Sequence, residues 1–537
     1  MDESSQTDSV PGERADTSKP VSQIRLIFRN VSVNYLVTGT ELLIGLFMLP
    51  FNVAHLGPSA YGLWVLAASV TVYFSMLDMG YGVAQVKFAA HYRAKGDTEA
   101  LNQIASTMFC VFTAVGLVTY TVAVLIAINL ESFFRLTPDQ AAIGRSVLLI
   151  VSAYVALGFP FSVFGGIVNG FQRTYLNGIV AIITAVVVAI VNVAVLRAGY
   201  GLFELVAATT SVRILSYFAY ALNAYRVFPA LRIRLQSFRW ARLREVTGFS
   251  VFILLIDLAN KLNYSTDTIV IGIFLSTVAV AIWAVAQRLI EIVQRITDQL
   301  NSVLFPVVVD SSTIQHTERL QKILLQGTRL SLAMVVPLAT GLALLARPVV
   351  YTWVGADFAG SVTIIQVLSI AVAIRVGNAT SSMILKGSGE HRLLAVANIV
   401  MAISNLILSL LLVQWYGLVG VAVGTLIPLV TVALLVVFPA ACRRVQLKRS
   451  EVIRKAVWPA IWPAVVMAGF LLITRNVFET GWAWLSVQVA SAGTIYAGLF
   501  LRFAINDSER DWYFAHIRRL INPRSPVSSG TELGITS

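Results

Sequence analysis

The chain has few charged residues and almost no cysteine. Lys, Arg, Asp and Glu make up 12% of its 537 residues, whereas a soluble domain carries about a quarter. The two cysteines, Cys110 and Cys442, lie in or beside apolar segments, which excludes a disulfide framework. The five histidines hold no pair at zinc-binding spacing. The shortage of charge excludes a soluble protein, and we expect neither a metal site nor a cofactor.

The sequence also lacks the parts that an enzyme would need. Gly387-Ser388-Gly389 has no lysine followed by serine or threonine, so it does not form a phosphate-binding loop. The longest loops expected on one side of the membrane, near Glu131–Arg145 and Arg347–Gly360, are too short to fold a catalytic domain. We therefore predict a protein that is not an enzyme.

Long apolar runs are abundant instead. Hydrophobic residues make up 57% of the chain, and a helix needs about 20 apolar residues to cross a bilayer. The sequence predicts an all-α integral membrane protein with about fourteen transmembrane helices. The expected spans are 31–53, 60–82, 104–129, 146–169, 176–197, 202–224, 247–275, 278–309, 325–346, 361–385, 393–414, 418–441, 456–474 and 481–503.

The basic residues indicate an orientation. Thirty of the 40 Lys and Arg residues fall in the tails or beside the loops after even-numbered spans, and five fall in the opposite loops. Because positive charge collects on the cytoplasmic side, both termini are expected in the cytoplasm. The net charge of +13 is explained by this asymmetry, so it does not call for a nucleic-acid partner.

An internal repeat divides the chain. Tyr200-Gly201-Leu202 and Tyr416-Gly417-Leu418 open two spans at an offset of 216 residues. Six spans per repeat predict two six-helix lobes related by a pseudo-two-fold axis along the membrane normal, plus two extra C-terminal helices. The expected parts are a cytoplasmic tail 1–30, an N-lobe 31–224, a basic linker 225–246, a C-lobe 247–441, a basic loop 442–455, the last two spans 456–503 and a disordered cytoplasmic tail 504–537.

Ionisable residues lie inside several spans, where an isolated charge costs about 2.5–3.5 kcal/mol on insertion scales. Span 278–309 places four of them on one helical face, at offsets of 0, 3, 7 and 10: Arg288, Glu291, Arg295 and Asp298. Span 247–275 carries a similar stripe and one further carboxylate: Asp257, Lys261, Tyr264 and Asp267. Three other spans add Asn34, Glu41, Arg213 and Arg375.

We interpret these polar faces as the walls of a wet cavity between two lobes. The cations Lys261, Arg288 and Arg295, with Arg213 and Arg375 as additions, suit a phosphate-bearing substrate. The remaining residues are expected to line the cavity or carry a coupling H+ or Na+. Glu41 and Asp267 are the candidates for coupling, and of the two we favour Glu41.

The alternative is that these charges only neutralise one another. Arg288 has Glu291 or Asp298 within reach, and Asp257 lies four residues before Lys261. Glu41 could pair with Arg213 or Arg375, which lie in other spans, so helical spacing does not decide between them. Both interpretations stay open for any single residue.

Several motifs resemble a known family. Leu56-Gly57-Pro58-Ser59-Ala60-Tyr61-Gly62-Leu63-Trp64, Leu77-Asp78-Met79-Gly80-Tyr81-Gly82 and His91-Tyr92-Arg93-Ala94-Lys95-Gly96-Asp97 are similar to the first hairpin of polysaccharide biosynthesis proteins. The segment from Ile384-Leu385-Lys386-Gly387 to Tyr416-Gly417-Leu418-Val419-Gly420 resembles their second-half counterpart. These proteins are the O-antigen and exopolysaccharide flippases of the multidrug/oligosaccharidyl-lipid/polysaccharide exporter (MOP) superfamily.

The resemblance implies an alternating-access flippase in the bacterial plasma (inner) membrane, with a cationic central cavity. It would move undecaprenyl-diphosphate-linked repeat units of capsule, lipopolysaccharide O-antigen or exopolysaccharide, driven by an ion gradient. Its implied partners are the bilayer, the lipid-linked oligosaccharide, a polysaccharide polymerase and the chain-length machinery. Lipid II flippases would carry more cations in spans 1 and 2, whereas span 1 here has Glu41.

Two other functions compete with this interpretation. A cation-coupled multidrug exporter of the same superfamily would need a cavity rich in carboxylates and aromatics, against which Lys261, Arg288 and Arg295 count. A membrane glycosyltransferase or polysaccharide polymerase would need a large external loop or an acidic metal-binding motif, and neither is evident.

Overall fold

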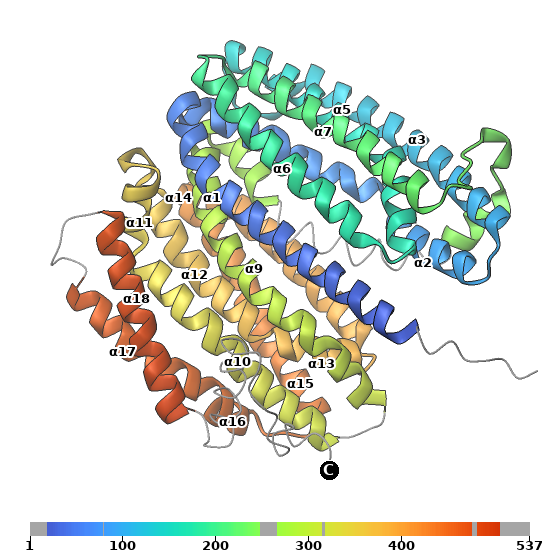
Figure 1. The fold of residues 1–537 in the computed structure, drawn as a ribbon. Helices are drawn as coiled ribbons and strands as arrows, with labels where there is room; N and C mark the ends of the chain where they lie inside the picture. Colours follow the sequence, from blue (N-terminus) through green and yellow to red (C-terminus); the bar gives the residue numbers. More distant parts are fainter. Residues whose placement is uncertain (1–18, 79, 248–265, 314–316, 475–480, 505–537) are drawn as a thin grey trace, which may run out of the picture.

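The computed structural model describes residues 19–78, 80–247, 266–313, 317–474 and 481–504, which are mostly helical and contain no strand (Figure 1). The helices are α1 (Lys19–Phe74), α2 (Tyr81–Ala94), α3 (Thr98–Ile128), α4 (Leu130–Phe133), α5 (Pro138–Gly170), α6 (Thr174–Arg197), α7 (Leu202–Val227), α9 (Thr277–Thr313), α10 (Thr317–Leu344), α11 (Ala346–Trp353), α12 (Ser361–Gly377), α13 (Ala379–Gly387), α14 (His391–Val432), α15 (Phe438–Arg444), α16 (Arg449–Val452), α17 (Trp458–Thr474) and α18 (Trp482–Leu499). Residues 266–274 form one further helical segment. Short 3-10 turns at Ser75–Asp78, Leu235–Ser237 and Ala356–Phe358, and π-helical turns at Ala433–Val437, Ile453–Val457 and Phe500–Ala504, complete the order.

The described residues contain 11 helices long and apolar enough to cross a membrane. Two of these, Phe28–Asp78 and Arg392–Arg444, are about twice the length that a bilayer needs. Each is interrupted by a glycine at positive φ, Gly57 (78°) and Gly417 (56°). These breaks fall between the predicted spans on either side, and most of the predicted span 247–275 lies outside the described residues. The predicted all-α membrane fold is confirmed, and the described helices are consistent with about fourteen spans.

The helices pack as two lobes (Figure 1). In the N-lobe, α3 and α7 pack on α5, and α6 packs on α1 and α7. In the C-lobe, α12 packs on α9, α10 and α14. Helix α1 lies against α9 and joins the two lobes, while α17 and α18 add to the outside of the C-lobe against α10. The α1–α9 contact therefore places the polar face of α9 beside the N-lobe.

Burial follows the same division. The largest cluster of buried apolar residues contains Leu63 and Leu66 of α1 together with Ile271 and Trp283 of the C-lobe. A second cluster lies within the N-lobe and includes Phe112 of α3. The lobes therefore share apolar packing along one part of their boundary.

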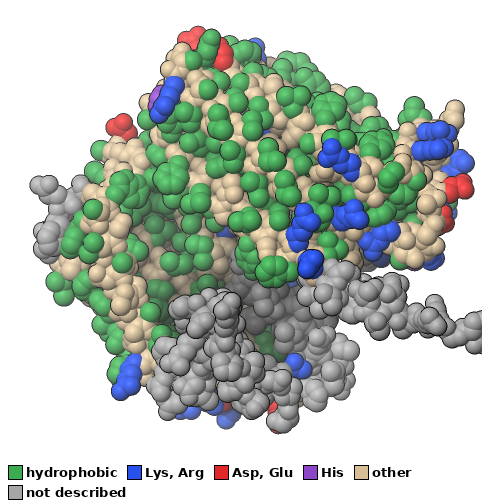
Figure 2. All heavy atoms as spheres, viewed as in Figure 1, with side chains coloured by type: hydrophobic (Ala, Val, Ile, Leu, Met, Phe, Trp, Pro, Cys, Tyr) green, Lys and Arg blue, Asp and Glu red, His purple; other side chains and the backbone are tan. Residues whose placement is uncertain are grey.

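The outer surface is apolar. Trp415 is 82% exposed, and Figure 2 shows hydrophobic side chains spread over the middle of the molecule. Lys and Arg gather instead toward the end at which α2 lies (Figure 2). An apolar belt with basic residues at one end is the surface of a multi-pass membrane protein.

Candidate functional site

A cavity of about 600 Å³ lies between the lobes. Helices α1, α5, α6 and α7 supply its N-lobe wall, and Thr268 and α9 supply its C-lobe wall. Its polar lining residues are Asn52, Tyr61, Ser69, Tyr154, Asn192, Thr209, Thr210, Arg213, Thr268, Gln287, Arg288 and Glu291. Three of the predicted site residues, Arg213, Arg288 and Glu291, thus line one cavity.

Arg288 reaches from α9 onto the backbone of α1. Its Nη1 forms an ion pair with Glu291 Oε2 at 3.4 Å, and its Nη2 donates to the Glu41 backbone carbonyl at 3.1 Å. A Cβ atom on Gly45 would overlap the Arg288 guanidinium. Because Gly45 has no side chain, the Arg288 guanidinium can lie directly against the backbone of α1; we call this space the seat of Arg288.

Glu41 and Arg295 form an ion pair across the lobes. Arg295 Nη1 lies 3.2 Å from Glu41 Oε2, and the two side chains are 43% and 49% exposed. Glu41 therefore pairs with Arg295 rather than with Arg213 or Arg375, the two partners that the sequence left open. Because both side chains are exposed, this pair contributes little to stability.

Arg213 lies on the opposite wall of the cavity. Its exposed guanidinium forms no ion pair with any residue that the structure describes. Close to it, the rings of Tyr154 and Tyr217 stack with centroids 5.3 Å apart and an interplanar angle of 2°. The Tyr217 hydroxyl donates to the Tyr154 backbone carbonyl at 3.0 Å, which holds the pair in place.

A second polar cluster lies inside the C-lobe, away from the cavity lining. Asp267 is 7% exposed and accepts a hydrogen bond at Oδ2 from Thr425 at 2.9 Å. Its buried Oδ1 has no hydrogen-bond partner among the described residues, and the Ser409 hydroxyl donates to Asn405 Oδ1 at 3.0 Å. A buried carboxylate oxygen without a donor is costly. The cluster therefore contains one buried carboxyl oxygen without a donor, near the hydroxyls of Thr425 and Ser409 and the guanidinium of Arg375.

Arg375 also belongs to the C-lobe. Its Nη1 donates to Gln294 Oε1 at 2.9 Å, so it contacts the back of α9 rather than the cavity. Asn34 is exposed on α1, where its backbone carbonyl accepts a hydrogen bond from Thr38 at 3.1 Å. Neither residue joins the group around Arg288.

Four predicted site residues lie wholly or partly outside the described part of the chain. Asp257, Lys261 and Tyr264 lie outside the described residues. Asp298 belongs to α9, but its side chain lies outside the described part. The predicted pairing of Asp257 with Lys261 and the role of Lys261 stay predictions.

The cavity includes residues that sequence analysis did not select. Tyr154 and Asn192 line it from α5 and α6, and Gln287 lies beside Arg288 on α9. Asn192 is 4% exposed within a run that is otherwise almost wholly apolar. A single amide in such a run was the available signal, since polar groups inside a membrane helix usually face the protein interior.

At the end where α5 and α9 begin, the lobes touch directly. Ser59 and Thr277 lie 3.2 Å apart at their hydroxyl oxygens, and Gln140 Nε2 donates to Ser59 at 2.8 Å. The backbone carbonyl of Thr277 occupies the space that a Cβ atom on Gly62 would need. The two lobes are therefore in direct contact at this end, through α1 and α5 on one side and α9 on the other.

Sequence comparison assigns the family. A family model described as polysaccharide biosynthesis protein matches residues 27–312, more than half of the chain. The chain belongs to the polysaccharide biosynthesis protein family. This confirms the resemblance found in the hairpin motifs. The matched region contains Glu41, Gly45, Arg213, Arg288 and Arg295.

Individual relatives agree with this assignment. The probable flippase AglR of Haloferax volcanii is 21% identical over 409 residues, which cover 74% of this chain and 80% of AglR. The lipid II flippase MurJ in an inward closed conformation superposes with a TM-score of 0.69 at 15% identity, covering 90% of this chain and 99% of MurJ. An inward-facing multidrug resistance MATE family transporter of the MOP superfamily gives a TM-score of 0.60 at 17% identity, covering 80% and 99%. The two structural likenesses establish a shared fold.

Proposed function

We propose that this polysaccharide biosynthesis protein is a flippase that moves lipid-linked glycans across a membrane by alternating access. The observation that carries the proposal is the cavity between the lobes, which is lined by Arg213 and Arg288 from opposite walls. Guanidinium groups bind phosphate oxygens through paired N–H donors, which suits the phosphate that links lipid to glycan. The name of AglR as a probable flippase supports the same function.

The carboxylates would balance the cations while the cavity is empty. Glu291 pairs with Arg288, and Glu41 pairs with Arg295. With Arg213 included, these five residues carry one net positive charge. A diphosphate would take the guanidinium groups from their carboxylate partners, so binding would exchange ion pairs rather than bury an isolated charge.

We assign the coupling role to Asp267 rather than to Glu41. Glu41 is exposed and already faces Arg295, whereas Asp267 has a buried oxygen without a donor and lies beside Thr425 and Ser409. Hard monovalent cations and protons both favour such oxygen donors. Binding of H+ or Na+ at this site would satisfy Oδ1. The C-lobe would then have an ion-bound and an ion-free state, and an ion gradient would set which of them is populated.

The finer features of the proposal come from the resemblance and the charge pattern. The cargo would be an undecaprenyl-diphosphate-linked repeat unit of capsule, O-antigen or exopolysaccharide in a bacterial plasma membrane. Both termini would be cytoplasmic, because the basic loops lie on that side. Because AglR comes from an archaeon, the test should compare more than one polyprenyl carrier.

The test is lipid transfer in proteoliposomes. A fluorescent polyprenyl-diphosphate oligosaccharide is placed in one leaflet, and its exposure to a membrane-impermeant quencher on the other side is followed. Wild type and Arg145→Gln, a control in an exposed pair with Glu131, should transfer the lipid. Arg213→Gln and Arg288→Gln should each slow transfer about ten-fold, since a charge-assisted hydrogen bond contributes roughly 1.5–3 kcal/mol.

Two results would overturn the proposal. Transfer at the wild-type rate by both arginine variants would remove the cationic cavity from the mechanism. No transfer by the wild type, together with ion-driven efflux of an organic cation, would establish the multidrug exporter instead.

A further inference from the structure

The linker segment 228–246, which follows α7, is held against the N-lobe by side chains of α3. It lies at the end of the lobe where α2 is found (Figure 1). Asn102 Nδ2 donates to the Ala230 carbonyl at 3.0 Å, and Asn102 Oδ1 accepts from the Arg232 backbone N–H at 2.8 Å. The Asn102 amide thus pairs with one backbone carbonyl and one backbone N–H of the linker segment, as a neighbouring β-strand would.

Two hydroxyl groups continue this attachment along α3. Ser106 Oγ accepts from the Arg234 backbone N–H at 3.1 Å, and Thr107 Oγ1 accepts from the Arg239 backbone N–H at 3.1 Å. Because these bonds go to the linker backbone, they fix its path without using its side chains. The Arg234 side chain stays exposed, and among the described residues the exposed Arg239 side chain makes only long contacts, at 3.5 Å, with the Gln236 and Phe238 carbonyls.

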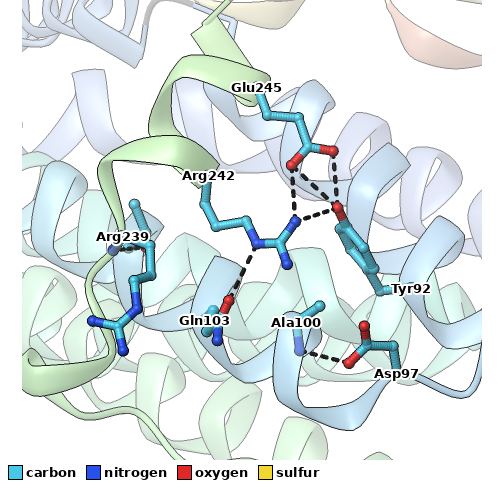
Figure 3. A network of polar contacts seen from close by, with 8 residues as sticks. Tyr92, Asp97, Ala100, Gln103, Arg239, Arg242 and Glu245 are labelled. Atoms are coloured by element: carbon cyan, nitrogen blue, oxygen red, sulfur yellow. Dashed lines mark hydrogen bonds and ion pairs between the residues drawn. The ribbon is translucent and has the colours of Figure 1, made fainter.

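One linker arginine is used internally (Figure 3). Arg242 Nη1 donates to the Tyr92 hydroxyl at 2.6 Å and pairs with Glu245 at 3.2 Å, and its Nε donates to Gln103 at 3.3 Å. Tyr92 in turn donates to Glu245 at 2.9 Å. Burial, together with the Glu245 carboxylate, raises the pKa of the Tyr92 phenol, so the hydroxyl keeps the proton that it donates. This network anchors the second half of the linker segment to α2 and α3.

The outward side of the same segment is both basic and apolar. Leu235 is 79% exposed and Trp240 is 74% exposed. The ring of Phe238 packs edge-on against Trp240 at 5.5 Å between centroids. Four exposed arginines form no ion pair with any residue in the described part of the chain: Arg232, Arg234, Arg239 and Arg244.

This combination fits the surface of a bilayer. Tryptophan settles at the level of lipid headgroups, and arginines beside it attract anionic headgroups. The segment lies at the end of helices that cross the membrane, where Lys and Arg gather (Figure 2), so headgroups are within reach of these side chains. A water-exposed loop would gain nothing from Leu235 and Trp240, whereas a lipid surface buries both.

We propose that the linker segment 228–246 binds the surface of anionic phospholipids, with Leu235 and Trp240 entering the headgroup layer and Arg232, Arg234, Arg239 and Arg244 contacting lipid phosphates. The hydrogen bonds from α3 present these side chains as a fixed surface on the N-lobe. The proposal does not depend on what the cavity transports.

The experiment measures contact between the segment and lipid in the full-length protein. Cys110 and Cys442 are replaced by serine, Leu235→Cys carries an environment-sensitive fluorophore, and the protein is reconstituted in phosphatidylcholine with or without phosphatidylglycerol. Quenching by a lipid with a spin label near its headgroup should be stronger when phosphatidylglycerol is present. The added change Arg234→Gln/Arg239→Gln should abolish this increase.

Arg197→Gln is the matched control, because Arg197 is an exposed arginine at the far end of α6. It should retain the phosphatidylglycerol response. Equal quenching in both lipids, no quenching in either, or an unchanged response in the Arg234→Gln/Arg239→Gln variant would each overturn the proposal. Thermal unfolding of each variant in detergent confirms that the comparison uses folded protein.

Discussion

The indole N–H of Trp353 in α11 donates a 2.9 Å hydrogen bond to the backbone carbonyl of Leu46 in α1. Pro50 follows Leu46 by four residues and has no N–H, so this carbonyl lacks its helical partner. A side chain of the C-lobe thus supplies the hydrogen bond that the Leu46 carbonyl does not receive within its own helix. The hydrogen bond ties the lobes together in addition to the contact between Ser59 and Thr277.

Trp353→Phe should weaken this connection. Loss of one hydrogen bond costs about 1 kcal/mol, which would raise the fraction of molecules with separated lobes by roughly five-fold. The readout is disulfide formation between Ser59→Cys and Thr277→Cys in a background without Cys110 and Cys442. Cross-linking should slow in Trp353→Phe and stay unchanged in Trp415→Phe, an exposed tryptophan of α14. Equal rates in all three proteins would show that the hydrogen bond does not hold the lobes.

Gly45→Ala should displace Arg288 from its seat. The added methyl group would occupy the place of the guanidinium, so transport should fall to a level close to that of Arg288→Gln. Because both changes disturb one contact, the double variant should be no slower than the worse single variant. Additive losses in the proteoliposome assay would show that the two residues act separately. Gly39→Ala is the control, since a Cβ there meets nothing within 4 Å.

Glu41→Gln and Arg295→Gln should have opposite effects on ligand binding. Removing the carboxylate frees Arg295 for a phosphate, so affinity for inorganic pyrophosphate should rise several-fold in Glu41→Gln. Removing the guanidinium should lower the affinity. Isothermal titration with the purified protein measures both. If the pair only holds the helices together, both variants should be less stable than wild type, and their affinities for pyrophosphate should be the same.

Asp267→Asn should remove the dependence of transport on the coupling ion. An amide keeps the size of the carboxylate but cannot balance a cation or take up a proton. Transfer in proteoliposomes, measured with and without Na+ or pH gradients, should lose its response to the gradient that drives the wild type. Thr425→Val should weaken the response. Thr431→Val should not, because Thr431 is an exposed residue of α14 whose hydroxyl donates to the Ile427 carbonyl. A full response in Asp267→Asn would place coupling elsewhere.

The fold was predictable because each span is a local pattern. Long apolar runs define the helices, and glycines at 57 and 417 separate neighbouring spans. The charged face of α9 was predictable for the same reason, since Arg288, Glu291 and Arg295 are related by helical spacing within one segment. The roles given to these residues remain predictions.

Contacts between distant segments could not be read from spacing. Arg295 and Glu41 are 254 residues apart, and their pairing depends on how α1 packs against α9. Asp267 and Thr425 are 158 residues apart and meet only inside the C-lobe. Asn102 likewise gives no sequence signal of its contact with the linker segment, because a polar residue at the end of a helix is also well placed in water.

The fit between Gly45 and Arg288 has a consequence for evolution in this family. A side chain at position 45 and an arginine at position 288 cannot occupy the same space. While the lobes keep this packing, a substitution at one position therefore requires a change at the other. Relatives that gain a side chain at the position of Gly45 should carry a shorter residue at the position of Arg288. Covariation between these two positions would then mark the relatives that share this arrangement of the cavity, even where overall identity is low.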